Sequence, residues 1–170
     1  RAIAFQGQVV SAKHGDMTEI YVVDLPDELP AQFMHQAGLS STGRIEPLPG
    51  ARQRRLTHTA DRRYPGLQGT RHWLRSSPDG SQIACLMKDE SGISQIFTVS
   101  PATGETKQLT HNASDISSAF TWSPDGRWIA HGMAGNICLT DSQTGATRPI
   151  TPPDAFGEIR KEACVFSPDG

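Results

Sequence analysis

The tetrapeptide Ser-Pro-Asp-Gly occurs three times in this chain of 170 residues, at 77–80, 123–126 and 167–170. In each copy Ser favours the start of a tight turn, Pro fixes φ at the second position, and Gly tolerates the positive φ at the end. A strand is therefore expected before and after each copy. The copies begin 46 and 44 positions apart, a period that is typical of four-stranded propeller blades.

The segments around the tetrapeptide also repeat, and each repeat contains four short strands. In the second repeat, one strand precedes the turn, the next two occupy 81–89 and 94–100, and the fourth ends in Leu109-Thr110. The strand at 81–89 is apolar on both faces, as expected of a sheet that packs between two others, and the fourth strand is polar, as expected on an outer rim. The pattern predicts an all-β fold, a β-propeller built of four-stranded antiparallel blades.

The same register extends through the amino-terminal third, so we expect about three blades of one partial propeller domain that spans 1–170. The predicted parts are a blade remnant at 1–57 with an insertion at 26–43, blades at 70–110 and 117–151, and the start of a further blade at 162–170. Three blades cannot close a ring, because propellers have at least four. We expect either a fragment of a larger propeller or a homodimer in which the terminal strand of one copy completes a blade of the other.

Composition narrows the class of protein. The chain has a formal net charge of -2, 36% hydrophobic residues, and no run near the roughly 18 apolar residues of a membrane span, so no membrane insertion is expected. Cys85, Cys138 and Cys164 are too far apart for a Cys-x-x-Cys site, and their odd number excludes a closed set of disulfides. Buried thiols are predicted, which favours a reducing compartment.

The stretch QLTHNASDISSAFTWSPDGRWIAHG, residues 108–132, resembles the repeat of TolB and its relatives, the WD-like Pro-Asp propeller repeats. The stretch RRLTHTADRRYPGLQGTRHWLRSSPDGSQIACLMKDE, residues 54–90, together with the repeats after it, is similar to an uncharacterised bacterial TolB-like family over nearly the whole chain. The resemblance implies a propeller of roughly six to eight blades in a chain more than twice this long. If the protein is bacterial, the predicted reduced thiols favour the cytoplasm over the periplasm.

The resemblance leaves three functions open, because a fold does not fix the chemistry that it carries. TolB propellers bind peptides and proteins at the channel mouth, and the leading hypothesis is a non-catalytic propeller of this kind that binds a protein or a small anionic ligand. Related propellers include oligogalacturonate lyases with a His-bound metal, which suggests a lyase or hydrolase acting on acidic saccharides. Others gate prolyl-oligopeptidase-type serine peptidases, which suggests a gating domain.

The strongest local feature is charge. Residues 51–75 contain seven arginines and one acid, so this stretch carries +6 and the rest of the chain -8. Part of it forms the predicted loop between two blades, at a mouth of the propeller, where guanidinium groups can hold a carboxylate or phosphate. The predicted ligand-binding residues are Arg62, Arg63, Arg71 and His72. The alternative is a solvated loop whose arginines pair with acids on neighbouring blades.

Other chemistry is not indicated. The chain is acidic overall, so nucleic acid is not expected as a partner. The sequence lacks a G-x-S-x-G elbow, a Walker loop, an H-E-x-x-H motif and a dinucleotide fingerprint, and no catalytic residue, cofactor or metal is predicted. The aspartates of the repeated turn, Asp79, Asp125 and Asp169, are expected to be structural, because a catalytic group is normally needed once.

Overall fold

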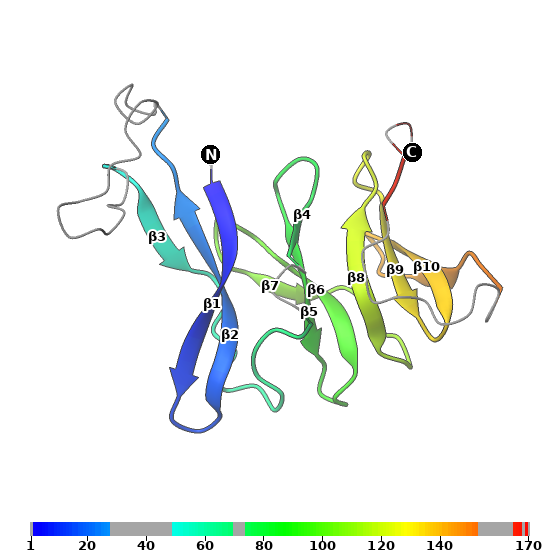
Figure 1. Ribbon diagram of the computed structural model, residues 1–170, viewed down its shortest axis with the longest axis horizontal. Helices are drawn as coiled ribbons and strands as arrows, with labels where there is room; N and C mark the ends of the chain where they lie inside the picture. Colours follow the sequence, from blue (N-terminus) through cyan, green and yellow to red (C-terminus); the bar gives the residue numbers. More distant parts are fainter. Residues whose placement is uncertain (1, 28–48, 70–73, 153–164, 168, 170) are drawn as a thin grey trace.

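The described residues of the computed structural model contain eleven strands, which form three antiparallel sheets that lie in a row (Figure 1). The structure describes residues 2–27, 49–69, 74–152, 165–167 and 169. No helix occurs among these described residues. The prediction of an all-β fold with four-stranded antiparallel sheets is confirmed.

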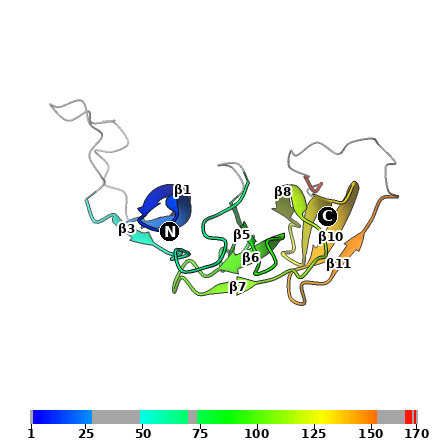
Figure 2. The ribbon, with the colours of Figure 1, turned by 90° about the horizontal axis from the view of Figure 1, so that it is seen from below.

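In every sheet, strands that follow one another in sequence are neighbours. The first sheet contains β1 (Ala2–Ser11), β2 (Gly15–Asp24) and β3 (Arg52–Arg55). The second contains β4 (Arg75–Ser76), β5 (Ile83–Lys88), β6 (Ser94–Val99) and β7 (Thr106–Gln108). The third contains β8 (Ile116–Trp122), β9 (Trp128–Met133), β10 (Asn136–Asp141) and β11 (Thr147–Pro149). The last strand of each sheet is largely exposed, and β7 and β11 lie along one side of the molecule (Figure 2).

Two of the Ser-Pro-Asp-Gly copies form the turns β4–β5 and β8–β9. In the first turn the amide of Gly80 donates to the carbonyl of Ser77 at 2.9 Å, and the Ser77 hydroxyl donates to Oδ1 of Asp79 at 2.6 Å. The second turn repeats both bonds, with the Ser123 hydroxyl 2.5 Å from Oδ1 of Asp125. Asp79 and Asp125 therefore close the turns, which confirms their predicted structural role.

The Leu-Thr or Ile-Thr pair after the last strand of each sheet also has the same structural role in each repeat. In all three sheets the threonine hydroxyl accepts a hydrogen bond from a backbone amide of the strand that pairs with the last strand. The pairs are Thr57 with Ile20, Thr110 with Ile96, and Thr151 with Ile137, at 2.9, 2.9 and 3.0 Å. These side chains supply an acceptor where the short last strand has already ended.

Two apolar cores lie between the sheets. The core between the first and second sheets contains Ile20, Val22, Leu56, Ile83, Cys85, Met87, Phe97 and Val99. The core between the second and third sheets contains Ala84, Leu86, Ile96, Leu109, Ile116, Phe120 and Ile129. Successive residues of β5 thus enter opposite cores, because side chains alternate along a strand. The prediction that this strand is buried on both faces is confirmed.

The Thr-Gly turns set how closely neighbouring sheets approach. Gly104, in the β6–β7 turn, has a φ of +77°, and a Cβ there would lie 2.7 Å from the carbonyl oxygen of Leu56 in the first sheet. Gly145, in the β10–β11 turn, has a φ of +75°, and a Cβ there would overlap the carbonyl oxygen of Leu109 in the second sheet. Only glycine satisfies both the positive φ and the close backbone contact.

The first sheet keeps an apolar face open. Ile3 and Phe5 are 56% and 36% exposed, and the Phe5 ring stacks on Tyr21 with centroids 5.6 Å apart. The corresponding residues of the second sheet, Ile83 and Cys85, are 3% and 0% exposed because the first sheet covers them. The open face of the first sheet is therefore equivalent to the face of the second sheet that the first sheet covers.

Some predictions fall outside the described residues. The insertion predicted at 26–43 is described only up to position 27, and of the blade start predicted at 162–170 only 165–167 and 169 are described. Cys85 and Cys138 are buried thiols, as predicted, whereas Cys164 lies outside the described residues. Within the described ranges, no helix is long and apolar enough to cross a membrane.

Candidate functional site

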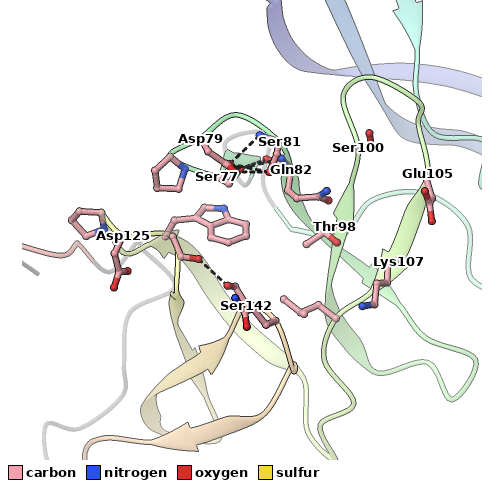
Figure 3. Close-up of a pocket in the computed structure, with 16 residues that line it drawn as sticks. Ser77, Asp79, Ser81, Gln82, Thr98, Ser100, Glu105, Lys107, Asp125 and Ser142 are labelled. Atoms are coloured by element: carbon pink, nitrogen blue, oxygen red, sulfur yellow. Dashed lines mark hydrogen bonds between the residues drawn. The ribbon is translucent and has the colours of Figure 1, made fainter.

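A cleft of about 690 Å³ opens between the second and third sheets, at the end of the sheets where the Ser-Pro-Asp-Gly turns lie. Its walls come from the β4–β5 and β8–β9 turns, the β6–β7 segment and the β10–β11 turn (Figure 3). In Figure 1 the β4–β5 and β8–β9 turns are at the top, and the β1–β2 hairpin turn is at the bottom. The cleft thus belongs to the end opposite the β1–β2 and β5–β6 turns.

Thr98 lies inside this cleft, on the face of β6 that looks toward the third sheet. Its strand neighbours are Ala84 on β5 and Lys107 on β7. Thr98 is only 8% exposed, and within the described part of the chain its hydroxyl makes no hydrogen bond. The equivalent positions of the other sheets hold Val22 and Leu139. At this position, which lines the cleft, a hydroxyl therefore replaces an apolar side chain.

The cleft carries more negative than positive charge. Its lining includes the carboxylates of Asp79, Glu105 and Asp125 and the ammonium of Lys107. The serine hydroxyl at the start of each turn, with nearby backbone amides, lowers the pKa of both turn aspartates, to about 2 for Asp79 and below its usual range for Asp125. Both carboxylates are therefore ionised at neutral pH.

Hydrogen bonds fix two walls of the cleft in place. The indole N–H of Trp122 donates to the carbonyl of Arg75 at 3.1 Å, which joins the second and third sheets. The hydroxyl of Ser142 donates to the carbonyl of Gly126 at 2.8 Å, which ties the β10–β11 turn to the β8–β9 turn. A cleft with walls held in this way loses less conformational freedom when a ligand enters.

The arginines predicted to bind a ligand lie at the other end of the sheets. Arg62 donates to the carbonyl of Lys88 at 2.7 Å, and its guanidinium lies 4.8 Å from the ring centre of Phe97. Arg63 is exposed, donates to the carbonyl of Glu90 at 3.3 Å, and packs over Tyr64. Both therefore attach their loop to the β5–β6 end of the second sheet.

Arg71 and His72, the other two predicted ligand-binding residues, lie outside the described residues. The structure therefore brings Arg62 and Arg63 together and gives no position for the remaining pair. Among the described residues, no group of three His, Cys, Asp or Glu side chains is arranged to hold a metal ion.

Other arginines of the charged stretch pair with acids of the first sheet. Arg54 forms an ion pair with Asp24, Nε to Oδ2 at 2.6 Å. Arg55 lies 3.0 Å from Oε1 of Glu19, a carboxylate that is 0% exposed and also accepts hydrogen bonds from Thr57 and Thr59. These two arginines pair with acids, as the alternative interpretation of the charged stretch predicts. The acids belong to the arginines' own sheet and not to a neighbouring blade.

The cleft residues Thr98 and Trp122 were not predicted as ligand-binding residues. One signal was available in the sequence, because aligning the repeats sets Thr98 against Val22 and Leu139. The position of Trp122 between two sheets has no such signal, since it depends on contacts across the cleft.

Comparison with known proteins agrees with the fold. No family model matches the chain. The chain is 43% identical over 173 residues to the uncharacterized protein YidR of Escherichia coli (strain K12), with 99% of this chain and 41% of that protein aligned. The chain thus spans about two fifths of the length of this curated relative.

Solved structures give the same result. TolB from Acinetobacter baumannii aligns with 89% of this chain and 30% of its own, at a TM-score of 0.54 and 24% identity. A putative TolB from Agrobacterium tumefaciens aligns with 91% of this chain and 44% of its own, at a TM-score of 0.53 and 21% identity. At these identities the likeness concerns the fold. The chain therefore has the propeller-like fold of TolB proteins, built of antiparallel sheets.

Proposed function

We propose that this chain is part of a non-catalytic binding module, a TolB-like propeller that holds a ligand or a segment of a partner protein in the cleft between its second and third sheets. The observation that carries the proposal is Thr98, a residue only 8% exposed on the cleft wall, whose hydroxyl makes no hydrogen bond within the described residues. A hydroxyl that lines the cleft and has no protein partner can donate to or accept from a ligand atom there. A volume of about 690 Å³ is in the range of ligand pockets.

The state of the cleft carboxylates supports binding over acid–base catalysis. Oδ1 of Asp79 accepts from the Ser77 hydroxyl and the Ser81 amide, Oδ2 accepts from the Ser81 hydroxyl, and these bonds lower the pKa of Asp79 to about 2. A general base works best when its pKa lies near the operating pH. Carboxylates held this far below neutrality act better as fixed negative charges than as proton acceptors.

We also propose that the chain belongs to an uncharacterised bacterial family related to TolB. The identity of 43% along 99% of this chain to an uncharacterized Escherichia coli protein supports this. The three copies of the Ser-Pro-Asp-Gly turn support the relation to TolB.

A second candidate is an anion-binding surface at the opposite end of the sheets, formed by Arg62, Arg63 and Lys88. The guanidinium of Arg63 and the ammonium of Lys88 lie 5.4 and 5.7 Å from the ring centre of Tyr64. In the described part of the chain neither forms a salt bridge. Two uncompensated cations over one ring favour an anionic guest there.

A ligand screen on the full chain separates the two candidates. We would measure thermal stabilisation by peptides, saccharides, nucleotides and small anions, and repeat it with Thr98→Val in the cleft and with Arg63→Gln in the loop. We expect the ligands that stabilise the chain to lose this effect in Thr98→Val and to keep it in Arg63→Gln. Loss in Arg63→Gln alone would favour the second candidate, and full retention in both variants would refute both sites.

A further inference from the structure

We infer that the guest of the cleft is a basic peptide segment, whose lysine or arginine side chain lies between Asp125, Trp122 and Thr98. The inference deepens the proposed function and rests on it. It names the chemistry of the guest, which the shape of the cleft alone does not specify.

Charge is the first argument. Three carboxylates, Asp79, Glu105 and Asp125, line the cleft against one cation, Lys107. In the β8–β9 turn the hydroxyl of Ser123 and an amide both donate to Oδ1 of Asp125, and no described group donates to its Oδ2. That oxygen is free to accept from an ammonium or guanidinium, and charge-assisted bonds of this kind are stronger than neutral ones.

The aromatic wall is the second argument. The indole N–H of Trp122 is already used by the carbonyl of Arg75, so the ring offers a guest its π system and no donor. Cations bind favourably over tryptophan rings. The chain makes this contact elsewhere, with the guanidinium of Arg148 4.9 Å from the ring centre of Trp128.

Thr98 supplies the third argument. The residue is 8% exposed and lines the cleft, and its hydroxyl can accept a hydrogen bond from a donor-rich group. In Figure 3 Thr98 lies between Gln82 and Lys107, across the cleft from Asp125 and Ser142. A guanidinium carries five N–H donors and can reach acceptors on both sides.

Size indicates a peptide over a free amine or an inorganic cation. The cleft of about 690 Å³ is larger than one side chain, and it leaves room for the backbone on each side of the basic residue. The serine, threonine and glutamine side chains of the lining, Ser81, Gln82, Ser100, Ser142 and Gln143, suit the amide groups of such a backbone.

Lys107 constrains where the guest's charge lies. It stands on β7 beside Thr98, and it is exposed. A second cation is repelled from this side of the cleft and is placed on the side of Asp125. The inference therefore assigns the main charge contact to Asp125 and a supporting hydrogen bond to Thr98.

The test measures binding of a short fluorescently labelled peptide with two arginines to the full chain by anisotropy. The comparison ligands are the same peptide with citrulline for arginine, a glutamate version, and a neutral oligosaccharide. We expect the citrulline peptide to bind about tenfold more weakly, since hydrogen bonds to charged groups are worth more than neutral ones. Asp125→Asn should weaken the arginine peptide about tenfold and Thr98→Val about fivefold, and Thr98→Ser should restore it.

The matched control is Asp16→Asn, which makes the same change in net charge at an exposed position near the start of β2. It should leave peptide binding unchanged. An equal effect of Asp16→Asn and Asp125→Asn would overturn the inference, because the attraction would then come from overall charge. Urea unfolding of each variant confirms that it is folded.

The remaining outcomes separate this inference from the proposed function. Equal affinity for the arginine and citrulline peptides overturns the inference. The inference is also overturned if the oligosaccharide or the glutamate peptide binds and Thr98→Val abolishes that binding. In this case the cleft remains the binding site of the proposed function. If no ligand of any class responds to Thr98→Val or Asp125→Asn, the proposed function fails as well.

Discussion

Acidification from pH 7.5 to 5.0 is expected to destabilise the chain through one buried histidine. His131 on β9 is 0% exposed, and its Nε2 lies 2.8 Å from Oγ1 of Thr140. Burial lowers its pKa from 6.5 to about 4, because the charged imidazolium is poorly solvated between two sheets. The folded state therefore holds His131 neutral at pH values where the unfolded chain already binds a proton.

The folded and unfolded pKa values of His131 determine how much stability is lost and over which pH range. Since the folded value is the lower one, the stabilisation is complete above pH 6.5 and is lost as the pH falls toward 4. Proton linkage gives a loss of about 2 kcal/mol between pH 7.5 and 5.0, and about 3 kcal/mol below pH 4. The aspartates with lowered pKa, such as Asp79 and Asp125, add their own loss only below about pH 4.

Urea unfolding at both pH values measures this effect. We would compare the parent chain with His131→Gln, which can keep a hydrogen bond to Thr140, and with His58→Gln, which removes an exposed histidine. The loss of about 2 kcal/mol on acidification should remain in His58→Gln and largely vanish in His131→Gln. The reasoning is refuted if His131→Gln loses as much stability as the parent chain.

Two further predictions concern the repeated motifs, with urea unfolding as the measurement. Gly80→Ala should cost about 1 to 2 kcal/mol from the positive φ alone, whereas Gly145→Ala should cost more than about 3 kcal/mol because its Cβ overlaps the carbonyl of Leu109; equal costs would contradict this. Thr110→Val should cost about 1 to 3 kcal/mol, since the buried amide of Ile96 loses its acceptor. A neutral Thr110→Val would contradict the role given to the Leu-Thr pair.

The repeated turns could be predicted because their geometry is local. The Ser77 hydroxyl, the Asp79 carboxylate and the Gly80 amide lie within four positions, and their hydrogen bonds close one turn. The burial of β5 on both faces was predictable for a similar reason, since alternation along a strand converts an apolar run into two apolar faces. Turn chemistry, period and strand polarity thus determined the fold class.

The predicted arginine site shows where this reasoning stops. Charge and loop length singled out Arg62 and Arg63, but neither quantity says what a guanidinium will touch. The partners of Arg62 are a carbonyl and a ring of the second sheet, 26 and 35 positions along the chain. A sequence does not show whether a long side chain turns outward to a ligand or inward to a distant backbone group.

By itself, then, the sequence determined an all-β chain of repeated antiparallel strands with Ser-Pro-Asp-Gly turns. The tertiary structure decided that the turns of two sheets face each other across a cleft, with Thr98, Trp122 and Asp125 on its walls. The physical reason is range. Turns and strand faces follow from neighbours a few positions apart, whereas a cleft between sheets follows from packing among residues that are tens of positions apart.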